Sequence, residues 1–412
     1  SRMPSGLGMG YRPSNIPNTS IKWESQEQWN VGVDLGFLHD RINLTVEWYK
    51  KTSSDMLMPL QLPSYMGTSG NASSALAAPK GNYGDIENTG FEISLNTHPI
   101  TGKFEWDSDF QISFNKNKLK GLAGTANAQI VGYGQWTDVV SVSSVGESLY
   151  NFYGFVCDGV YKDLEDLQTS PKPAKYPANG VFDRTNTVWV GDVKYKDISG
   201  PDGVPDGVID DYDKTNIGSP MPKFTFGWTN TFRYKNFDLS VFINGSYGNK
   251  VYNYLSMKLT HMNSPWTNQL NAVNGRAQLV PINPNKVYEE GTMWYNVVSN
   301  VMVANPGASI PRATINDPND NDRISDRNIE DGSYIRLKNI SLGYTFPKKT
   351  IDKLGLSNLR IYANIQNLLT ITGYDGYDPE IGASTSSVNV YGLDNGRYPS
   401  PTVYSFGLNV SF

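Results

Sequence analysis

The stretch YSFGLNVSF, residues 404–412, decides the fold class of this chain. Every second side chain is apolar, at Tyr404, Phe406, Leu408, Val410 and Phe412, and the residues between them are serine, glycine or asparagine. Successive side chains of a β-strand point to opposite faces, so this pattern predicts a strand with one apolar and one polar face.

The same alternation recurs along the whole chain. Further rows of alternating apolar side chains occupy residues 29–37, 42–48, 91–95, 104–114, 224–234, 237–247, 340–346 and 359–365. With a weaker segment at 153–161, we expect about ten strands of roughly 10 residues, the length that crosses a bilayer at a tilt.

The connections between these segments alternate in length. Short turns are expected near His39, Gly102 and Asn236, whereas residues 53–82, 162–222, 249–332 and 370–400 form long segments rich in Gly, Pro, Asn and Ser. Loops of this length argue against a compact soluble domain. The pattern therefore predicts an all-β fold, a transmembrane antiparallel β-barrel with short periplasmic turns and long extracellular loops.

Composition bounds the alternatives. No stretch approaches the ~20 consecutive apolar residues of a transmembrane helix, and mean hydropathy is -0.44. Aromatic residues make up 12% of the chain, which suits the aromatic girdles of a barrel, although composition alone fits a secreted β-sandwich equally well. A net charge of -5 without a dense Lys/Arg run argues against nucleic acid as a partner.

The sequence carries no catalytic signature, so we do not expect an enzyme. Cys157 is the one cysteine and is interpreted as a packed thiol. His39, His98 and His261 have no Cys or His partner at ligand spacing, which makes zinc improbable. The sequence contains neither a nucleophile-elbow motif nor a phosphate-cradling glycine loop.

Several motifs, in one order, point to a family. They are Trp23-Glu24 with GVDLGF at 32–37, RINLTVEWYKKT at 41–52, NTGFE at 88–92, GES at 146–148 with FYG at 152–154, SYIRLKNISLGY at 333–344, NL at 367–368 with YDGYDPE at 374–380, and FGLNVSF at 406–412. As a set they resemble the SusC-like (SusC/RagA) family of TonB-dependent outer-membrane transporters.

The resemblance implies a barrel of about 22 strands with an amino-terminal plug, a segment that contacts TonB, and a SusD-like surface lipoprotein over the extracellular mouth. Residues 1–412 are then expected to be the carboxy-terminal part of the barrel, with the plug and the amino-terminal strands outside this chain. Phe412 would be a true carboxy terminus, and Ser1, which begins no signal peptide, would not be a true start.

The function that the resemblance implies is TonB-dependent import of oligosaccharides or oligopeptides across the outer membrane of a Gram-negative bacterium. The expected assembly is a dimer of transporter–lipoprotein pairs in outer-membrane lipid. A passive porin is the alternative, and a secreted sugar-binding β-sandwich is a third. The row from Tyr404 to Phe412 also resembles the signal that the barrel-assembly machinery recognises.

An acidic segment at 197–213 resembles a calcium loop. Counted from Asp202, Asp206 falls at position 5, Gly207 at 6, Val208 at 7, Asp210 at 9 and Asp213 at 12. Position 3 is Val204, and in a second alignment Asp197 and Ser199 supply the first ligands. The segment predicts bound Ca²⁺, with Mg²⁺ less favoured, or else a solvated acidic turn.

Aromatic residues in the long segments are candidates for contact with a substrate or a partner. Equally, they could pack one loop against another. They include Trp136, Trp266, Trp294, Tyr374, Tyr377 and Tyr391.

Overall fold

The computed structural model describes residues 17–59, 79–122, 128–134, 138–289, 291–382 and 389–412. They form two compact units. One takes its residues from 1–95, 113–130 and 143–149, and the other takes its residues from 96–112, 131–142 and 150–412.

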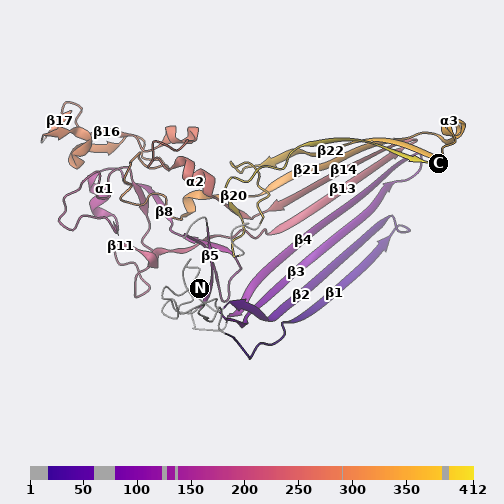
Figure 1. Ribbon diagram of the computed structural model, residues 1–412, viewed down its shortest axis with the longest axis horizontal. Coiled ribbons are helices and arrows are strands. Elements are labelled where there is room, and N and C mark those ends of the chain that lie inside the picture. The colour runs from indigo at the N-terminus through magenta and orange to yellow at the C-terminus, as the bar shows by residue number, and fades with distance from the viewer. Residues whose placement is uncertain (1–16, 60–78, 123–127, 135–137, 290, 383–388) are drawn as a thin grey trace, which may run out of the picture. The chain divides into compact units, whose positions relative to one another are not determined.

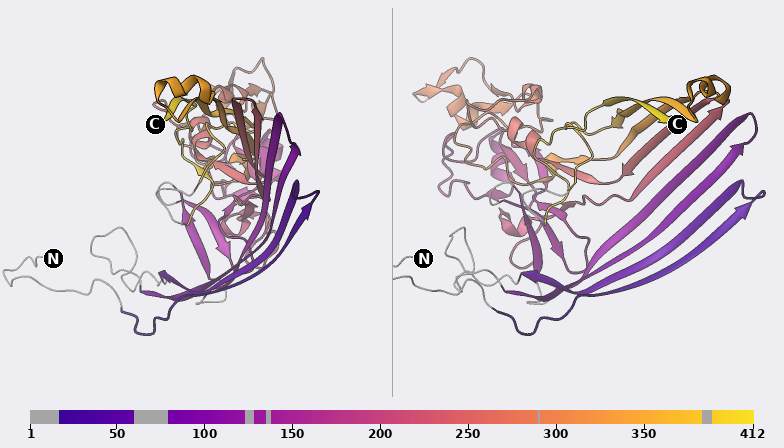
Figure 2. Two further views of the ribbon diagram at one scale, coloured as in Figure 1. Left: turned by 90° about the vertical axis from the view of Figure 1, so that its right-hand side faces the viewer. Right: turned by 45° about the vertical axis from the view of Figure 1, so that its right-hand side comes forward.

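Nine long strands form one sheet in the order β1-β2-β3-β4-β13-β14-β21-β22-β24 (Figures 1 and 2). They are β1 (Ser25–Phe37), β2 (Ile42–Pro59), β3 (Lys80–Ile100), β4 (Phe104–Leu122), β13 (Phe224–Tyr234), β14 (Phe237–Tyr247), β21 (Tyr334–Thr345), β22 (Asn358–Thr372) and β24 (Val403–Ser411). The antiparallel all-β prediction is confirmed, and its alternating rows lie on these nine strands.

The register pairs the predicted apolar rows with one another. Val33 of β1 lies opposite Val46 of β2, and Leu35 lies opposite Leu44. At the other end of the strand order, Leu408 of β24 lies opposite Ile361 of β22. Directly opposed residues share a face of the sheet, so each face keeps one character from strand to strand.

One predicted strand is wrong. Residues 153–161 do not join the large sheet but divide into β7 (Asn151–Gly154) and β8 (Cys157–Val160), which belong to two smaller sheets. Three of the four residues of β7 are buried. A strand that is covered on both faces has no lipid-facing row, which explains why its alternation was weak.

The connections have the predicted arrangement. Turns of a few residues join β1 to β2, β3 to β4 and β13 to β14 at one end of the strands. A connection containing α3 (Lys348–Ile351) joins β21 to β22 at the same end (Figure 1). The long connections join the strands at their other end. β2 extends further than predicted because its ladder with β1 continues where the alternation stops, as at Ser25 of β1 opposite Ser54 of β2.

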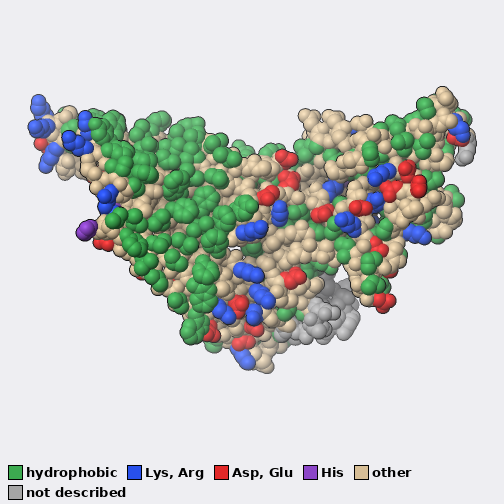
Figure 3. Space-filling view, turned by 180° about the vertical axis from the view of Figure 1, so that it is seen from behind, with side chains coloured by type: hydrophobic (Ala, Val, Ile, Leu, Met, Phe, Trp, Pro, Cys, Tyr) green, Lys and Arg blue, Asp and Glu red, His purple; other side chains and the backbone are tan. Residues whose placement is uncertain are grey.

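One face of the long strands is apolar and exposed. Trp29 of β1 is 62% exposed and Phe406 of β24 is 85% exposed. On the face shown in Figure 3, hydrophobic side chains cover the long strands. Such a surface is far larger than the apolar patches of soluble proteins, and it matches the lipid-facing side of a membrane barrel.

Aromatic side chains gather at both ends of the strands. Near the turn between β13 and β14, the ring of Phe237 lies 4.7 Å from that of Tyr344, centroid to centroid. Near the long connections, the rings of Phe224 and Tyr247 lie 5.1 Å apart. Two aromatic bands separated by the length of a strand correspond to the two interfaces of a bilayer.

The long connections after β4 build a second structure, which we call the loop body and define as the described residues of 150–222, 248–333 and 373–402. Its elements are short. They are the helices α1 (Leu164–Thr169) and α2 (Tyr254–Thr260) and the strands β7, β8, β9 (Lys172–Pro173), β10 (Val193–Tyr195), β11 (Val208–Ile209), β12 (Thr215–Gly218), β15 (Lys250–Asn253), β16 (Leu279–Pro281), β17 (Tyr288–Glu289), β18 (Thr292–Met293), β19 (Val301–Val303), β20 (Ile329–Asp331) and β23 (Leu393–Asp394). The remaining short strands, β5 (Gln129–Tyr133) and β6 (Val139–Ser144), pair in one sheet with β7 and β12.

The loop body has its own hydrophobic core. Trp189 is fully buried among residues from two long segments, including Val160 from the first and Ala277 and Val301 from the second. A second cluster surrounds Tyr252. Burial of this kind stabilises segments that would otherwise be too long to stay ordered.

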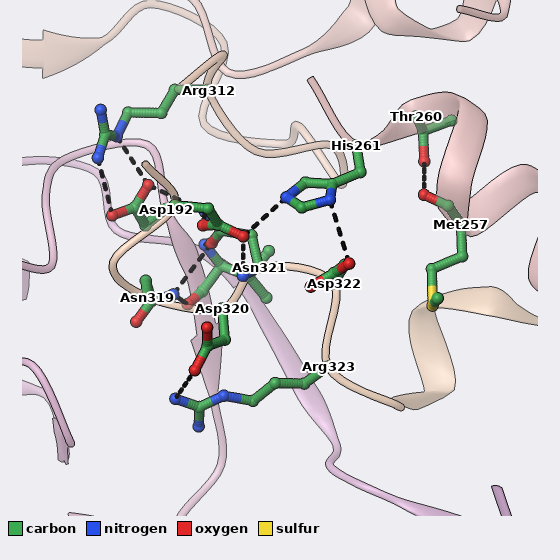
Figure 4. A network of polar contacts seen from close by, with 12 residues as sticks. Asp192, Met257, Thr260, His261, Arg312, Asn319, Asp320, Asn321, Asp322 and Arg323 are labelled. Carbon is green, nitrogen blue, oxygen red and sulfur yellow. Dashed lines mark hydrogen bonds and ion pairs between the residues drawn. The ribbon is translucent and has the colours of Figure 1, made fainter. Parts of the chain in front are cut away.

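Buried charges join the segments of the loop body (Figure 4). Arg312 binds the carboxylate of Asp192 through Nε, 2.7 Å from Oδ1, and through Nη2, 3.2 Å from Oδ2. Asn321 donates to the same carboxylate over 3.2 Å and accepts the backbone N–H of Val193 at 2.7 Å. A buried charge is tolerated only when it is paired and hydrogen-bonded in this way.

His261 continues this network. Its Nε2 lies 2.7 Å from Asp317 Oδ2, and its Nδ1 lies 3.1 Å from Asp322 Oδ2. Ionised carboxylates only accept hydrogen bonds, so both ring nitrogens must carry a proton. Burial lowers the pKa of His261, but the two carboxylates outweigh it and raise the pKa to about 9. Lys258 adds a second cation, 3.1 Å from Asp322.

This geometry makes the loop body sensitive to alkaline pH. The pKa of His261 rises from an ordinary value of 6.5 to about 9, so the stabilisation is complete below about pH 6.5 and lost as pH rises through 9. Replacing His261 with Asn leaves the buried carboxylate of Asp317 and the half-buried carboxylate of Asp322 without their shared cation. We expect a loss of about 3–5 kcal/mol in the stability of the loop body.

Limited proteolysis of the full-length protein, with fragments identified by mass spectrometry, measures this effect. His261→Asn is expected to be cleaved faster within 249–332 at pH 7, and the wild type is expected to approach it near pH 10. His39→Asn, in an exposed turn, is the matched control. Equal cleavage of His261→Asn and the wild type at pH 7 would contradict the assignment.

Candidate functional site

Two of the sequence motifs meet at the end of the strands where the long connections begin. Arg336 of the SYIRLKN motif is 2% exposed and bonds to both acidic residues of the YDPE motif. Its guanidinium contacts Asp378 and lies 2.7 Å from Glu380 Oε2. Lys338 lies 3.1 Å from the same Glu380 oxygen. The two motifs therefore form one ion cluster.

An irregularity of β21 positions this cluster. Between Leu337 and Asn339 the register shifts against both neighbouring strands. Lys338 is an extra residue against β14, whereas two residues of β22, Asn367 and Leu368, lie opposite it. The apolar row consequently passes from Ile340 to Leu337 and stays on one face. A β-bulge re-aims the side chain at its centre, and here Lys338 turns toward Glu380.

The segment that follows β22 is held in place by further bonds. Asp378 accepts the backbone N–H groups of Glu380 and Ser400, each over 3.0 Å. Burial raises the pKa of Asp378, but these hydrogen bonds and Arg336 outweigh it and hold the pKa below its usual range. The carboxylate is thus ionised at neutral pH and fixes the loop to the sheet.

A polar pocket of about 480 Å³ lies beside the ion cluster. Its lining includes Lys338, Glu380, Arg397, Tyr334 and Tyr391. Thr225 and Ser246, from the polar face of β13 and β14, complete one wall. Tyr391 is therefore the one predicted aromatic residue that lines this pocket within the described chain.

The other predicted aromatic residues fall into different settings. Tyr374 is buried and donates its hydroxyl to Asp394 over 2.6 Å, which favours a packing role. Trp294 packs against the core around Trp189. Trp266 is 94% exposed and Tyr377 is also exposed. Trp136 lies outside the described residues.

The acidic segment forms a tight turn around Asp213. Asp213 is fully buried, and its carboxylate accepts the backbone N–H groups of Ile198, Ser199 and Asp210 at 2.7, 3.2 and 2.9 Å. It also belongs to a capping box with Asp210 at the short helix Asp211–Asp213. This carboxylate is therefore occupied by backbone donors.

The other predicted ligands lie in the same turn. Asp197 Oδ2 accepts the N–H of Gly207 over 2.6 Å, whereas its Oδ1 is buried and has no hydrogen-bond partner in the described chain. Asp206 accepts the N–H of Val208 over 3.0 Å, and Asp202 is exposed. Ser199 donates its hydroxyl to the carbonyl oxygen of Gly200 over 3.3 Å. The turn thus holds one buried carboxylate oxygen that could accept a cation.

Sequence spacing did not find the His261 cluster, because its partners Asp317 and Asp322 lie more than 50 residues away. Among the described residues, this is the group of His, Cys, Asp and Glu whose ligand atoms lie within 4.8 Å of one another. The two carboxylates approach opposite ring nitrogens of His261. In this arrangement a single metal ion would not contact the imidazole and both carboxylates. The geometry fits a protonated imidazole better.

Cys157 has the predicted packed position. It is half-buried against the cluster of Phe155, Val193, Tyr195 and Ile209. Burial raises the pKa of its thiol to about 11, so it is protonated at neutral pH. No helix among the described residues is both long and apolar enough to cross a membrane.

Comparison with known proteins identifies the family to which this architecture belongs. Residues 2–368 match the family described as TonB dependent receptor-like, beta-barrel. TonB-dependent receptor P3 of Formosa agariphila is 31% identical over 97% of this chain, which covers 35% of that relative. TonB-dependent receptor SusC of Bacteroides thetaiotaomicron is 28% identical over 96% of the chain, which covers 32% of it. The chain thus spans about a third of the length of the curated relatives it matches.

Solved structures show the same fold. The structure of the RagAB peptide transporter matches 96% of this chain with a TM-score of 0.69 at 19% identity, and the match covers 36% of that structure's chain. The RagAB peptide importer in its "open-open" state matches 98% of the chain with a TM-score of 0.66 at 20% identity, and 37% of that chain is covered. With its antiparallel sheet, apolar outer face and family match, this chain belongs to the TonB-dependent receptor β-barrel family of the Gram-negative outer membrane.

Proposed function

We propose that the full-length protein imports oligosaccharides or oligopeptides across the outer membrane with energy supplied through TonB. The observation that carries this proposal is the sheet, which is apolar on one face and polar on the other. Its polar face leads into the pocket beside Arg336, at the end of the strands where the long connections begin. A solute path along the inside of a barrel needs such a polar wall.

The relatives support the mode of transport and leave the cargo open. SusC and the TonB-dependent receptors of Formosa agariphila carry TonB dependence in their names, and RagAB is named as a peptide transporter. By analogy we infer a SusD-like lipoprotein as the surface partner and a dimer of transporter–lipoprotein pairs. The plug, the TonB-contacting segment and the remaining strands of the barrel belong to this proposal.

Deleting TonB tests the proposal. Cells that express the full-length protein are expected to take up a labelled oligosaccharide or peptide library, and uptake is expected to fall to background without TonB. Immunoblots of outer-membrane fractions control for the amount of the protein in both strains. Undiminished uptake without TonB would contradict active import and favour a passive porin.

We also propose that the acidic turn at 197–213 binds Ca²⁺ through Asp197 and Asp206. Two features of the turn support this: the unpartnered buried oxygen of Asp197, and the position of Asp206 beside Gly200. A Cβ built on Gly200 would lie 2.7 Å from Asp206 Oδ2, so the glycine permits this close approach. Oxygen ligands alone suit Ca²⁺ ahead of transition metals.

Removing calcium tests this second proposal. Chelation with EGTA is expected to speed proteolysis of the wild type within 197–213, because a bound ion would hold the turn together, and added Ca²⁺ is expected to reverse it. Asp206→Asn should lose this calcium response. Asp211→Asn, at an exposed carboxylate of the same segment, is the control. Identical digestion patterns with and without Ca²⁺ would refute the proposal.

The apolar row from Tyr404 to Phe412 as a signal for barrel assembly stays a prediction. The side chains of the row are exposed on β24, which pairs on one side with β22, and at Phe412 directly after it. A lower outer-membrane level of the full-length protein without Phe412 would support the signal, and a normal level would count against it.

A further inference from the structure

A second pocket lies within the loop body and has a different chemical character. Its volume is about 680 Å³, and it is lined by three arginines, Arg184, Arg276 and Arg312. No aspartate or glutamate is among its lining residues. In a chain with a net charge of -5, a pocket whose only charged groups are cations calls for a physical explanation.

One of the three arginines is neutralised. Arg312 forms the paired hydrogen bonds with Asp192 described above, and its Nη2 also donates to the carbonyl oxygen of Arg184 over 3.2 Å. Its role is therefore to hold the segment of Arg184 against its own. It leaves the pocket with two further guanidinium groups.

Arg184 and Arg276 form no direct ion pair with an acidic residue in the part of the chain that the structure describes, although the charge of Asp192 acts on Arg184. Arg276 donates one hydrogen bond, over 3.3 Å to the carbonyl oxygen of Val273. Arg184 stacks on the ring of Tyr295, with 5.1 Å from its Cζ to the ring centroid. Its Nε is buried and has no hydrogen-bond partner among the described residues.

This arrangement leaves strong donors unused. Stacking on Tyr295 covers one face of the Arg184 guanidinium, but its N–H groups lie in the plane of the group and need acceptors. Burial and the charge of Arg312 lower the pKa of Arg184, yet an arginine remains charged at neutral pH. Arg184 is half-buried, and an anion in the pocket would give its buried Nε the acceptor that it lacks.

Polar, uncharged side chains complete the lining. Thr185, Ser264, Gln269, Asn274 and Asn316 offer hydroxyl and amide groups that can bond to sugar hydroxyls or peptide groups. The volume lies in the range of pockets that hold small ligands. Thus the pocket combines a charge for one group of a solute with neutral contacts for the rest.

We propose that this pocket, here called the arginine pocket, binds an oxyanion of the imported solute, a carboxylate or a sulfate ester on an acidic oligomer. The proposal rests on the import function proposed above and adds the chemical class of the cargo. Arg184 and Arg276 make the charge-assisted hydrogen bonds, and guanidinium groups suit such planar or tetrahedral oxyanions. Arg312 and Tyr295 hold Arg184 in position.

Binding to the purified full-length protein in detergent tests the proposal by isothermal titration calorimetry. The probes are hexagalacturonate, a sulfated hexasaccharide, a hexaglutamate peptide and neutral maltohexaose. At least one acidic probe is expected to bind more tightly than maltohexaose, with affinity that weakens as salt rises. The first three probes also distinguish a sugar carboxylate, a sulfate ester and a peptide as the source of the oxyanion.

Variants locate the binding. Arg184→Gln and Arg276→Gln are each expected to weaken the acidic probe about tenfold or more, and Arg184→Lys is expected to recover part of the loss. Lys175→Gln, an exposed residue of the loop body outside the lining, removes one positive charge and should change little. Equal proteolysis patterns of all variants establish that the loop body is intact.

Three outcomes would overturn the proposal. They are equal affinity for maltohexaose and the acidic probes, full affinity in Arg184→Gln and Arg276→Gln, and loss of probe binding when the SusD-like lipoprotein is added, since an acidic side chain of the partner would then fill the pocket. TonB-dependent uptake of an acidic solute that is as fast in Arg184→Gln as in the wild type would show that the import function stands while this inference fails.

Discussion

The hydrogen-bonding demand of a backbone in hydrocarbon is the constraint on which this structure depends. No water reaches the lipid interior, so every N–H and C=O group in a spanning strand must pair with a neighbouring strand. The nine-strand antiparallel ladder meets this demand along its inner strands. The demand also explains why one face can stay apolar from Trp29 to Phe406, because the backbone leaves no polar group for that face to cover.

Beyond the strands the physical problem is reversed. The loop body must stay ordered in water over long stretches of chain, and it does so with two small hydrophobic cores and with buried charges that join distant segments. Asp192 and Arg312 are 120 residues apart, and Arg336 is 42 residues from Asp378. The first pair joins two segments of the loop body, and the second joins β21 to the segment that follows β22.

The sequence predicted the large sheet well and the loop body poorly, for a physical reason. Lipid on one face imposes a strict period of two, so the rows of β1, β14 and β24 are visible in the sequence. Residues 153–161 belong to the short strands β7 and β8 of smaller sheets, and their weak alternation resembles that of a membrane strand. The ion cluster around Arg336 could be anticipated as two motifs but not as one site. His261 and Arg184 were missed because their surroundings come from residues that are far apart in the chain.

The orientation of the sheet toward lipid is the central claim, and single cysteines on adjacent residues of β21 test it most directly. In a full-length protein otherwise free of cysteine, Leu342→Cys and Ser341→Cys would carry a fluorophore in bilayers that contain brominated lipid. Leu342 is on the exposed apolar row, opposite Leu239, and Ser341 is on the other face, opposite Ser240. We predict strong quenching at position 342 and little at 341. Equal quenching at both positions, or quenching at 341 alone, would contradict the account.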